Sequence, residues 1–465
     1  MAIGLPVATI PMARTFAEAI ELLTSRSSKL LQVQHPDKAR LSRPNNYYMR
    51  EWLMLLGHDM QQLNVIHITG TKGKGSTCAF TESLLRSHSQ RARTSLKTGL
   101  YTSPHLQTER ERIRIDFKPV TEAVFAKYLF EVWERLSTAT QIWPGYLQLL
   151  TLLSIHIFIS EGVDIAIYEV HAGGRHDATN IFEKPIACGF TPIGLDHIPL
   201  LGRNVKDIAW HKSGIMKSGS PAFSVAQRED VTEVLKAESD KIGCNLTFVP
   251  DDIDQSTIPK TLVPAEIENL SLAIRLANAY LSRTNKRLDN DDISSGIDEY
   301  YWPGRFQLIE IGLSRWYLDI AHNEISIPVA LAWFCKVAQE YERTAGRQSR
   351  VLIFGSPTGR DAAKLMDLVV QFCNSEHFYF DKVMLTAYVR RVDGMEIFDL
   401  EVAELQKASL MGISSPPTVM STRSVQDALN LAQQEGSIQA LIFGSSHLIS
   451  NAYSFLLKIG HQEQH

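Results

Sequence analysis

The sequence predicts an α/β protein of two domains, each built around a mainly parallel sheet with helices on both faces. Two observations predict this architecture. Short runs rich in β-branched residues alternate with longer stretches of helical periodicity, and glycine-rich turns follow several of the runs. The alternation then begins afresh after the turn-like Trp302, Pro303 and Gly304. Regular alternation of strands and helices favours parallel strands joined by crossover helices.

The length of the chain also supports two domains. It has 465 residues, whereas one domain usually holds ~100 to 200 residues. Apolar residues make up 44% of the sequence and charged residues 21%, which is the balance of an ordinary globular protein. We expect a first domain over residues 1–303 and a smaller α/β domain over residues 304–465.

Hydrophobic periodicity predicts where the elements lie. In the first domain, a strand at 64–69 precedes a glycine-rich loop, and residues 100–119 are expected to form a long, charged loop. The expected helices of this domain are 16–31, 48–56, 78–86, 122–136, 148–160 and 267–283, and its further strands are 163–170 and 187–194. In the second domain we expect strands at 316–320, 351–354 and 439–443 and a helix at 327–341.

Composition excludes several classes of partner. Lysine and arginine total 47 against 51 acidic residues, so no excess of positive charge indicates a nucleic acid partner. The longest apolar stretch, residues 147–159, is shorter than the ~20 residues of a membrane span, so no membrane anchor is expected. Five scattered cysteines without CxxC spacing suit a reducing compartment. We expect a cytoplasmic protein, and a mitochondrial form stays open.

A glycine-rich loop carries the first sign of chemistry. It follows a strand and opens a helix, where backbone amides and a helix N-terminus converge on phosphate oxygens. Lys74 can reach the β- and γ-phosphates, and Ser76 or Thr77 offers a hydroxyl to phosphate or Mg²⁺. The spacing departs from the strict GxxxxGK[ST] pattern, and a merely flexible turn is the alternative. The predicted nucleotide-binding residues are Gly70, Thr71, Lys72, Gly73, Lys74, Gly75, Ser76 and Thr77.

The loop and seven further blocks resemble the folylpolyglutamate synthase family, which belongs with the Mur ligases, and above all its eukaryotic and fungal members. The loop block is HITGTKGKGSTCAF at 67–80. The blocks follow the family's order, and the resemblance covers nearly the whole chain. They are TGLYTSPHL at 98–106, ERIRI at 111–115, YEVHAGGRHDATN at 168–180, GLDHIPLLG at 194–202, IAWHKSGIMK at 208–217, WPGR at 302–305 and LDIAHN at 318–323.

The resemblance implies an N-terminal P-loop-type ATPase domain and a C-terminal Rossmann-like domain. In the family, the terminal carboxylate of a folate takes the γ-phosphate of ATP, and the amine of glutamate then displaces phosphate. ATP and Mg²⁺ are therefore the implied cofactors, with a monovalent cation as an option. The implied partners are a folate-like carboxylate and glutamate, and we expect a monomer. The site must close, because water would hydrolyse the acyl phosphate.

The resemblance also assigns metal ligands. Ser103, Glu169 and His197 match residues that bind Mg²⁺, a hard cation that prefers oxygen. Glu169 also ends an apolar strand, where the carboxyl ends of parallel strands meet the ligand crevice. Lys212 matches a lysine that carries a carbamate, and carbon dioxide adds only to a neutral amine, so the site must depress its pKa. A solvated glutamate, a structural histidine and an ordinary surface lysine are the alternatives.

Four further residues match positions at the nucleotide or the reacting groups. Asn269 and Arg305 match residues that hold the nucleotide, and Asp319 matches one that contacts ATP from the second domain. His322 is expected near the acyl phosphate or the incoming amino acid. We therefore assign catalysis to Lys74 and His322 together with the carbamate lysine.

Several positions depart from the family pattern. His171 stands in place of a glycine, and its bulky ring would restrict the metal site. His211 replaces a glutamate, Ile320 replaces a glycine and Gly355 replaces an asparagine. The phosphate loop itself is intact.

Three functions fit these observations. The first is a folylpolyglutamate synthase. The second is a divergent paralogue that couples an amino acid to a carboxylated secondary metabolite. The third is a nucleotide-binding protein without ligase activity.

Overall fold

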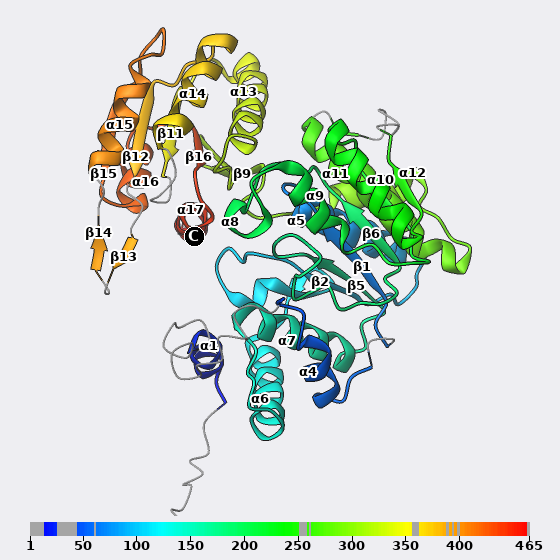
Figure 1. The fold of residues 1–465 in the computed structure, drawn as a ribbon. Helices are drawn as coiled ribbons and strands as arrows, with labels where there is room; N and C mark the ends of the chain where they lie inside the picture. Colours follow the sequence, from blue (N-terminus) through cyan, green and yellow to red (C-terminus); the bar gives the residue numbers. More distant parts are fainter. Residues whose placement is uncertain are drawn as a thin grey trace, which may run out of the picture. The chain divides into compact units, whose positions relative to one another are not determined.

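The computed structural model describes residues 14–25, 44–59, 62–250, 258–259, 262–355, 362–386, 390–392, 395–397 and 400–462. The chain forms two compact units. One comprises Met1–Ile258 with Glu266–Tyr300, and the other comprises Pro259–Ala265 with Tyr301–His465. Figure 1 shows their helices and strands. The assignment of residues 1–303 and 304–465 to separate functional domains stays a prediction.

The first unit is built on a sheet in which eight strands are described, in the order β4-β3-β2-β5-β1-β6-β7-β8. In this order, the strands β2, β5, β1, β6, β7 and β8 each pair in parallel with the next. Strands β3 and β4 are antiparallel and form the edge beside β2. The strands are β1 (Val65–Thr69), β2 (Thr98–Tyr101), β3 (Ile113–Ile115), β4 (Lys118–Pro119), β5 (Ile165–Glu169), β6 (Ala187–Phe190), β7 (Ala222–Ser224) and β8 (Leu246–Phe248).

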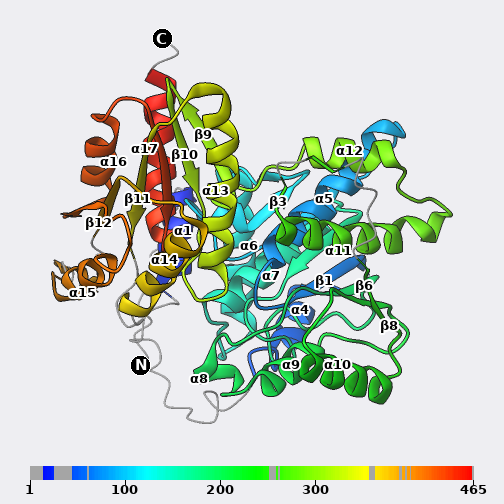
Figure 2. The same ribbon diagram turned by 90° about the horizontal axis from the view of Figure 1, so that it is seen from above.

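Helices cover both faces of this sheet, and Figure 2 shows the two layers. On β6, Gly189 faces Leu276 of α11, whereas Cys188 and Phe190 pack in a cluster with residues of α9 and α10. Helix α5 lies on the α11 side with α12 packed on it, and α7 with α4 and α6 lies on the other side. The helices are α1 (Phe16–Ser25), α4 (Met49–Leu55), α5 (Lys74–Arg91), α6 (Glu122–Ala139), α7 (Tyr146–Ser160), α8 (Ile198–Leu201), α9 (Val205–Ser213), α10 (Glu229–Ile242), α11 (Pro264–Leu281) and α12 (Asn290–Asp298).

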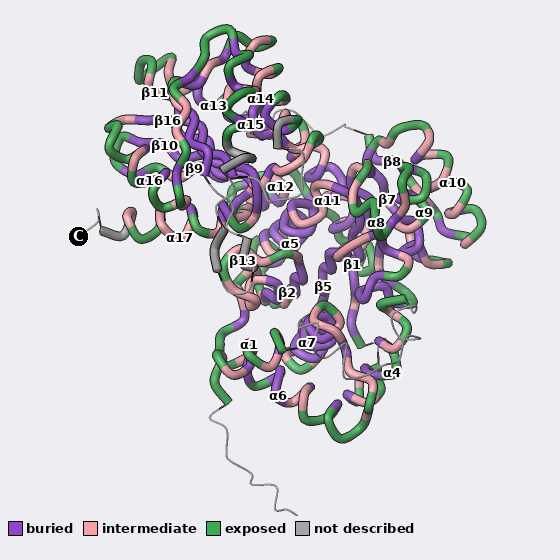
Figure 3. The backbone as a smooth tube through the Cα atoms, turned by 60° about the vertical axis from the view of Figure 1, so that its left-hand side comes forward, coloured by how far each residue is buried: buried purple, intermediate pink, exposed green. Residues whose placement is uncertain are grey.

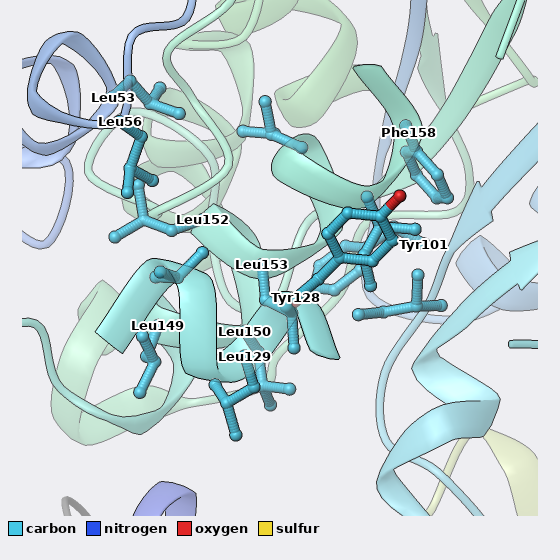
Figure 4. Close-up of a cluster of buried hydrophobic side chains, with 14 of the residues drawn as sticks. Leu53, Leu56, Tyr101, Tyr128, Leu129, Leu149, Leu150, Leu152, Leu153 and Phe158 are labelled. Atoms are coloured by element: carbon cyan, nitrogen blue, oxygen red, sulfur yellow. The ribbon is translucent and has the colours of Figure 1, made fainter. Parts of the chain in front are cut away.

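Helix α7 forms the centre of the larger core. A helix that is apolar on every side is stable only when it is buried all round, and residues 149–158 of α7 are all buried. Its leucines pack beside Leu53 and Leu56 of the α4 region and Leu129 of α6, as Figure 4 shows. Figure 3 shows the same burial along the strands. None of the helices in the described part of the chain has the length and apolarity to cross a membrane.

The expectation of one long loop at residues 100–119 is wrong. The stretch contains the end of β2, a 3-10 helix at Glu109–Arg112 and the strands β3 and β4. Isoleucines alternate with arginines there, a period of two that marks a strand, but the high charge suggested a loop. The Glu111 carboxylate accepts hydrogen bonds from the amides of Leu106, Gln107 and Thr108, which organises the turn.

The second unit contains a smaller sheet with the described order β15-β12-β11-β16-β10-β9, parallel except for the β9–β10 pair. Helices α13 and α14 pack on one face in a shared apolar cluster, and α16 and α17 contact the strands as well. The elements are β9 (Gln307–Ile311), β10 (Ser314–Leu318), α13 (Ser326–Ala345), β11 (Ser349–Phe354), α14 (Ala362–Glu376), β12 (Lys382–Thr386), β13 (Arg390–Val392), β14 (Met395–Ile397), α15 (Leu400–Leu410), β15 (Thr418–Thr422), α16 (Val425–Gln433), β16 (Ile438–Phe443) and α17 (Ser446–Gln462).

The predicted fold class is confirmed, since both units are α/β with mainly parallel sheets. The expected helix at 16–31 is seen as α1 over Phe16–Ser25, and residues 26–31 lie outside the described residues.

Candidate active site

The three central strands of the first unit end side by side. Strand β1 pairs in parallel with β5 and with β6, and the register aligns Ile68 with Glu169 and Thr69 with Phe190. Parallel strands share one edge of the sheet at their carboxyl ends. The glycine loop after β1, Glu169 on β5 and the segment after β6 therefore emerge together.

Two glycines of the loop lie where no side chain fits. Gly70 has φ +154° and Gly73 has φ +80°, backbone conformations that favour glycine. A Cβ on Gly70 would lie 1.8 Å from Oγ1 of Thr191, and a Cβ on Gly73 would lie 2.2 Å from Oδ1 of Asn269. The loop is therefore a packed turn, held between β6 and α11.

Helix α5 begins at Lys74, earlier than its predicted start at residue 78. Gly75, Ser76 and Thr77 therefore belong to its first turn, where backbone amides lack partners within the helix and the helix dipole favours an anion. The hydroxyl of Thr77 donates to Oδ1 of Asn269 at 3.2 Å. The predicted nucleotide residue of α11 is thus next to the loop.

The first residues of the loop are tied to the segment after β6. The amides of Thr71 and Lys72 donate to the Pro192 carbonyl at 2.8 and 3.4 Å. The hydroxyl of Thr71 donates to the Gly194 carbonyl at 3.0 Å, and that of Thr191 donates to the Lys72 carbonyl. Hydrogen bonds therefore hold the loop against the segment that carries His197.

A lysine and a buried glutamate face each other at this edge. Nζ of Lys74 lies 4.0 Å from Oε1 of Glu169, and Glu169 is only 4% exposed. Its other oxygen, Oε2, accepts a hydrogen bond from the amide of Ser103 at 2.8 Å. The structure thus brings together three of the residues that the sequence predicted from distant blocks.

Lys212 lies beneath the loop. It is 2% exposed, and its Nζ donates to the Gly70 carbonyl at 2.6 Å. Burial, followed by the charge of Lys74, lowers the pKa of Lys212 well below its ordinary value. The neutral amine that carbon dioxide requires is therefore favoured here.

The turn after β5 packs closely against the residues around Lys212. The amide of Arg175 donates to the His211 carbonyl at 2.6 Å. A Cβ on Gly174 would lie 2.8 Å from the Lys212 carbonyl oxygen. The glycine turn after Glu169 therefore positions the helix end that carries the lysine.

His197 is more exposed than the other predicted ligands. It directly precedes α8, with φ +49°, and 49% of its side chain is exposed. Burial lowers the pKa of His197, the nearby Asp196 raises it, and the charge of Lys74 lowers it further. The neutral imidazole, which is the form that binds metals, is favoured.

The donor set fits a magnesium ion bound together with phosphates. In the described part of the chain, no group of three or more histidine, cysteine, aspartate and glutamate side chains is placed to hold a metal ion. Mg²⁺ usually takes one or two carboxylates and completes its shell with substrate phosphates and water. One buried carboxylate, Glu169, beside a phosphate loop is such an arrangement. Ser103 and His197 are the other residues that would hold the ion.

The predicted residues of the second unit gather at the carboxyl end of β10. The Asp319 carboxylate accepts hydrogen bonds from the amides of Phe306 at 3.0 Å and Ala321 at 2.8 Å. Asp319 thereby ties the turn that carries Arg305 to the loop that carries His322. Nδ1 of His322 lies 2.7 Å from the Ile320 carbonyl oxygen, so Nδ1 is the donor of this pair.

Comparison with known proteins identifies the family. No protein-family model matches the chain. It is 34% identical to the folylpolyglutamate synthase of Neurospora crassa over 492 residues, which covers 96% of this chain and 92% of that protein. The chain belongs to the folylpolyglutamate synthase family. Its identity to a Saccharomyces cerevisiae folylpolyglutamate synthase is 37% over 418 residues, or 84% of this chain and 74% of the yeast protein.

Solved structures of the family share the fold. The apo form of the L. casei synthase superposes with a TM-score of 0.72 at 24% identity and covers 95% of this chain and 100% of its own. The Thermotoga maritima synthase has a TM-score of 0.73 at 21% identity, over 95% of this chain and 96% of its own. Both likenesses concern the fold.

His171 replaces the glycine of the family pattern. Its ring contacts Tyr101 and Asp177 rather than the predicted metal ligands. Its Nε2 lies 2.8 Å from the hydroxyl of Tyr101, and its Nδ1 lies 3.4 Å from Oδ1 of Asp177. Asp177 also accepts the amide of Ala172 at 2.9 Å. The ring braces the turn after β5, and the expectation that it restricts the metal site gains no support from these contacts.

The other departures from the family pattern are also accommodated. The His211 ring lies edge-on to Trp210, with centroids 5.0 Å apart, at the surface of α9. A Cβ on Gly355 would lie 3.0 Å from Cγ2 of Thr386, so an asparagine there would require Thr386 to move by a few tenths of an ångström. The amide of Ile320 donates to the Gly304 carbonyl at 3.0 Å, a contact that any residue except proline can make.

Sequence reasoning missed Thr191, which contacts both Gly70 and Lys72. Its signal was a polar residue directly after a buried strand. That signal becomes specific only once β6 is known to lie beside β1.

Proposed function

We propose that this protein adds L-glutamate to the terminal carboxylate of tetrahydrofolate or its polyglutamates, through an acyl phosphate, with release of ADP and phosphate. The observation that carries the proposal is the position of Lys74, in the first turn of α5 and 4.0 Å from the buried Glu169. Relatives named folylpolyglutamate synthase support the substrates. Solved structures of the same fold described as complexes with ADP and with AMPPCP support the nucleotide.

In the first step, an oxygen of the folate carboxylate attacks the γ-phosphorus of ATP, and the bond to the β-γ bridging oxygen breaks. Lys74 and the amides at the start of α5 stabilise the charge on the transferred group and on ADP. Mg²⁺, held by Glu169, Ser103 and His197, would supply further neutralisation of phosphate charge. Lys212, as a carbamate, would add an anionic oxygen to this site.

In the second step, the glutamate amine attacks the acyl carbon, phosphate leaves and an amide bond forms. Nδ1 of His322 donates to the Ile320 carbonyl, so in the neutral ring the other nitrogen carries the lone pair. That nitrogen is suited to accept a proton from the incoming ammonium group. Arg305 would hold the phosphates, and Asp319 keeps both residues in place through backbone contacts. In this proposal, residues 1–303 form the ATP-binding domain with the phosphate loop, and residues 304–465 form the ligase domain, which adds Arg305 to the phosphates.

The location and the assembly of the protein are further parts of the proposal. A cytoplasmic monomer without nucleic acid or membrane partners fits the near-neutral composition, with 47 basic and 51 acidic residues. A mitochondrial form is open as well, because some relatives are named as mitochondrial enzymes.

A phosphate-release assay tests the function. With ATP, Mg²⁺, tetrahydrofolate and glutamate, the purified protein should release phosphate only when both folate and glutamate are present. If phosphate is released only when another carboxylate replaces the folate, the paralogue that acts on a secondary metabolite is favoured. Nucleotide binding without release under any of these conditions would favour a non-catalytic protein.

A further inference from the structure

Arg112 is a buried cation beside the candidate active site. It ends the 3-10 helix before β3 and is 7% exposed. Its carbonyl accepts the amide of Thr102 at 3.0 Å, and the next residue, Ser103, donates its amide to Glu169. Arg112 therefore lies against the same segment that carries a predicted metal ligand.

The two side chains that contact the Arg112 guanidinium are neutral groups, although the charge of Glu109 acts on both of them. Its Nε donates to Nδ1 of His105 at 2.9 Å. The guanidinium carbon lies 5.8 Å from the ring centre of Tyr146. Burial, followed by the charge of Arg112, lowers the pKa of His105, and burial raises the pKa of Tyr146. Both neighbours are therefore neutral at pH 7.

The nearest glutamate in sequence is already engaged. The carboxylate of Glu111 accepts three backbone amides in the turn before Arg112. In the described part of the chain, Arg112 forms no ion pair with a carboxylate. A buried guanidinium without an anion is costly, because its desolvation is not compensated.

Other buried arginines in the described chain are satisfied. Arg350, 9% exposed, pairs with Glu342, with Nε 3.0 Å from Oε1. Arg114, 7% exposed like Arg112, donates to the carbonyls of Glu111 at 3.0 Å and Phe117 at 3.2 Å. Arg112 differs from both, since a half-buried imidazole and phenol are its neighbours.

We propose that Arg112 binds a carboxylate of the acyl donor other than the one that is phosphorylated. This inference rests on the proposed function. A donor that ends in glutamate carries two carboxylates, the reacting γ-carboxylate and the α-carboxylate beside it. The guanidinium fork matches a carboxylate through two parallel hydrogen bonds. Arg112 thus selects donors whose terminal glutamate carries a free α-carboxylate. By binding that group, it orients the γ-carboxylate towards the phosphate site.

The test compares two donors and three variants. The donors are a folate that ends in glutamate and the same folate with its α-carboxylate capped as a primary amide. The variants are Arg112→Gln, Arg112→Lys and, as a matched control, Arg114→Gln, and the readouts are KM for each donor, kcat and KM for ATP. Far-UV circular dichroism and thermal melting check that each variant is folded.

The proposal predicts a specific pattern. Arg112→Gln raises KM for the natural donor by roughly 30-fold or more, the loss expected when one partner of a buried charge pair is removed. It leaves KM for the amide donor and for ATP within about twofold. Arg112→Lys restores part of the affinity because it keeps the charge without the fork. Arg114→Gln affects both donors equally.

Equal losses for both donors in Arg112→Gln, or no loss for either, would overturn the proposal. The proposed function fails separately, if the wild-type protein shows no phosphate release that depends on folate and glutamate. In that case, equilibrium binding of the two donors to wild type and Arg112→Gln still decides the role of Arg112.

Discussion

Nζ of Lys212 donates a hydrogen bond to the carbonyl oxygen of Gly70 at 2.6 Å. The contact joins the end of α9 to the first residue of the phosphate loop, so the chemical state of the lysine and the position of the loop are linked. Because Lys212 is buried beside a second lysine, Lys74, its neutral form is favoured. Burial and the charge of Lys74, rather than this contact, favour the neutral amine that carbon dioxide requires.

If Lys212 acts as a carbamate, activity depends on dissolved carbon dioxide. We expect the wild-type enzyme to lose activity in buffer depleted of carbon dioxide and to regain it on addition of bicarbonate. Lys212→Arg, which cannot form a carbamate because arginine stays charged, should be weakly active and insensitive to bicarbonate. Wild-type rates that are unchanged by carbon dioxide would contradict the assignment.

Removal of the lysine from the phosphate loop should abolish turnover. Lys74→Ala loses the cation that we propose to face the transferred phosphate, and we expect kcat to fall by ~10²-fold or more. Lys206→Ala removes a lysine that pairs with Glu233 at the surface and should keep nearly full activity. Steady-state phosphate release measures both variants, and a Lys74→Ala enzyme of normal rate would refute the loop assignment.

Gly73→Ala should damage nucleotide binding by more than backbone strain alone. Gly73 and Gly219 both have positive φ, at +80° and +77°, so alanine at either costs about 1–2 kcal/mol in unfolding free energy. Only at Gly73 would the new Cβ meet another atom, Oδ1 of Asn269 at 2.2 Å, whereas nothing lies within 4 Å at Gly219.

Thermal melting with and without ATP separates the two effects at these glycines. Both alanine variants should melt at a lower temperature than wild type. The stabilisation by ATP should be lost only in Gly73→Ala. If ATP stabilises both variants equally, the tight contact with Asn269 is not important for binding.

The histidine pair between α4 and α7 should make the protein less stable in mild acid. Nε2 of His58 lies 2.6 Å from Nδ1 of His156, which in turn lies close to Glu131. Burial, followed by the charge of His156, lowers the pKa of His58 from 6.5 to about 4. Between these values the unfolded chain binds a proton that the folded chain does not, so the free energy of unfolding falls as the pH drops from 6.5 towards 4.

Urea unfolding at pH 7.5, 6.0 and 5.0 measures this dependence. His58→Gln keeps a hydrogen-bonding group but does not titrate, so its stability should change less over the same range. The burial of His58 is partial, and we expect the loss to be smaller than a fully buried group would give. Equal slopes for wild type and variant would show that other groups dominate.

The sequence predicted much of this protein because its signals are local. The alternation of strands and helices predicted the α/β class, and the glycine loop with Lys74 predicted a phosphate site between a strand and a helix. The errors were local as well. The charge of residues 100–119 concealed the period of two that marks β3, and the start of α5 was placed too late because its first turn contains glycine and hydroxyl residues.

The sequence by itself determined which reactive groups are available: a lysine and hydroxyls in a glycine loop, a glutamate at a strand end and Lys212, which the family resemblance predicts to carry a carbamate. Only the tertiary structure decided which of these groups meet. The strand order places β1 between β5 and β6, which brings Lys74 to Glu169, Gly70 to Thr191 and Lys212 to the loop. It also leaves Arg112 buried, with no ion pair to a carboxylate among the residues that the structure describes. Such contacts join residues far apart in the chain, and they depend on how whole sheets and helices pack, which no local pattern of residues records.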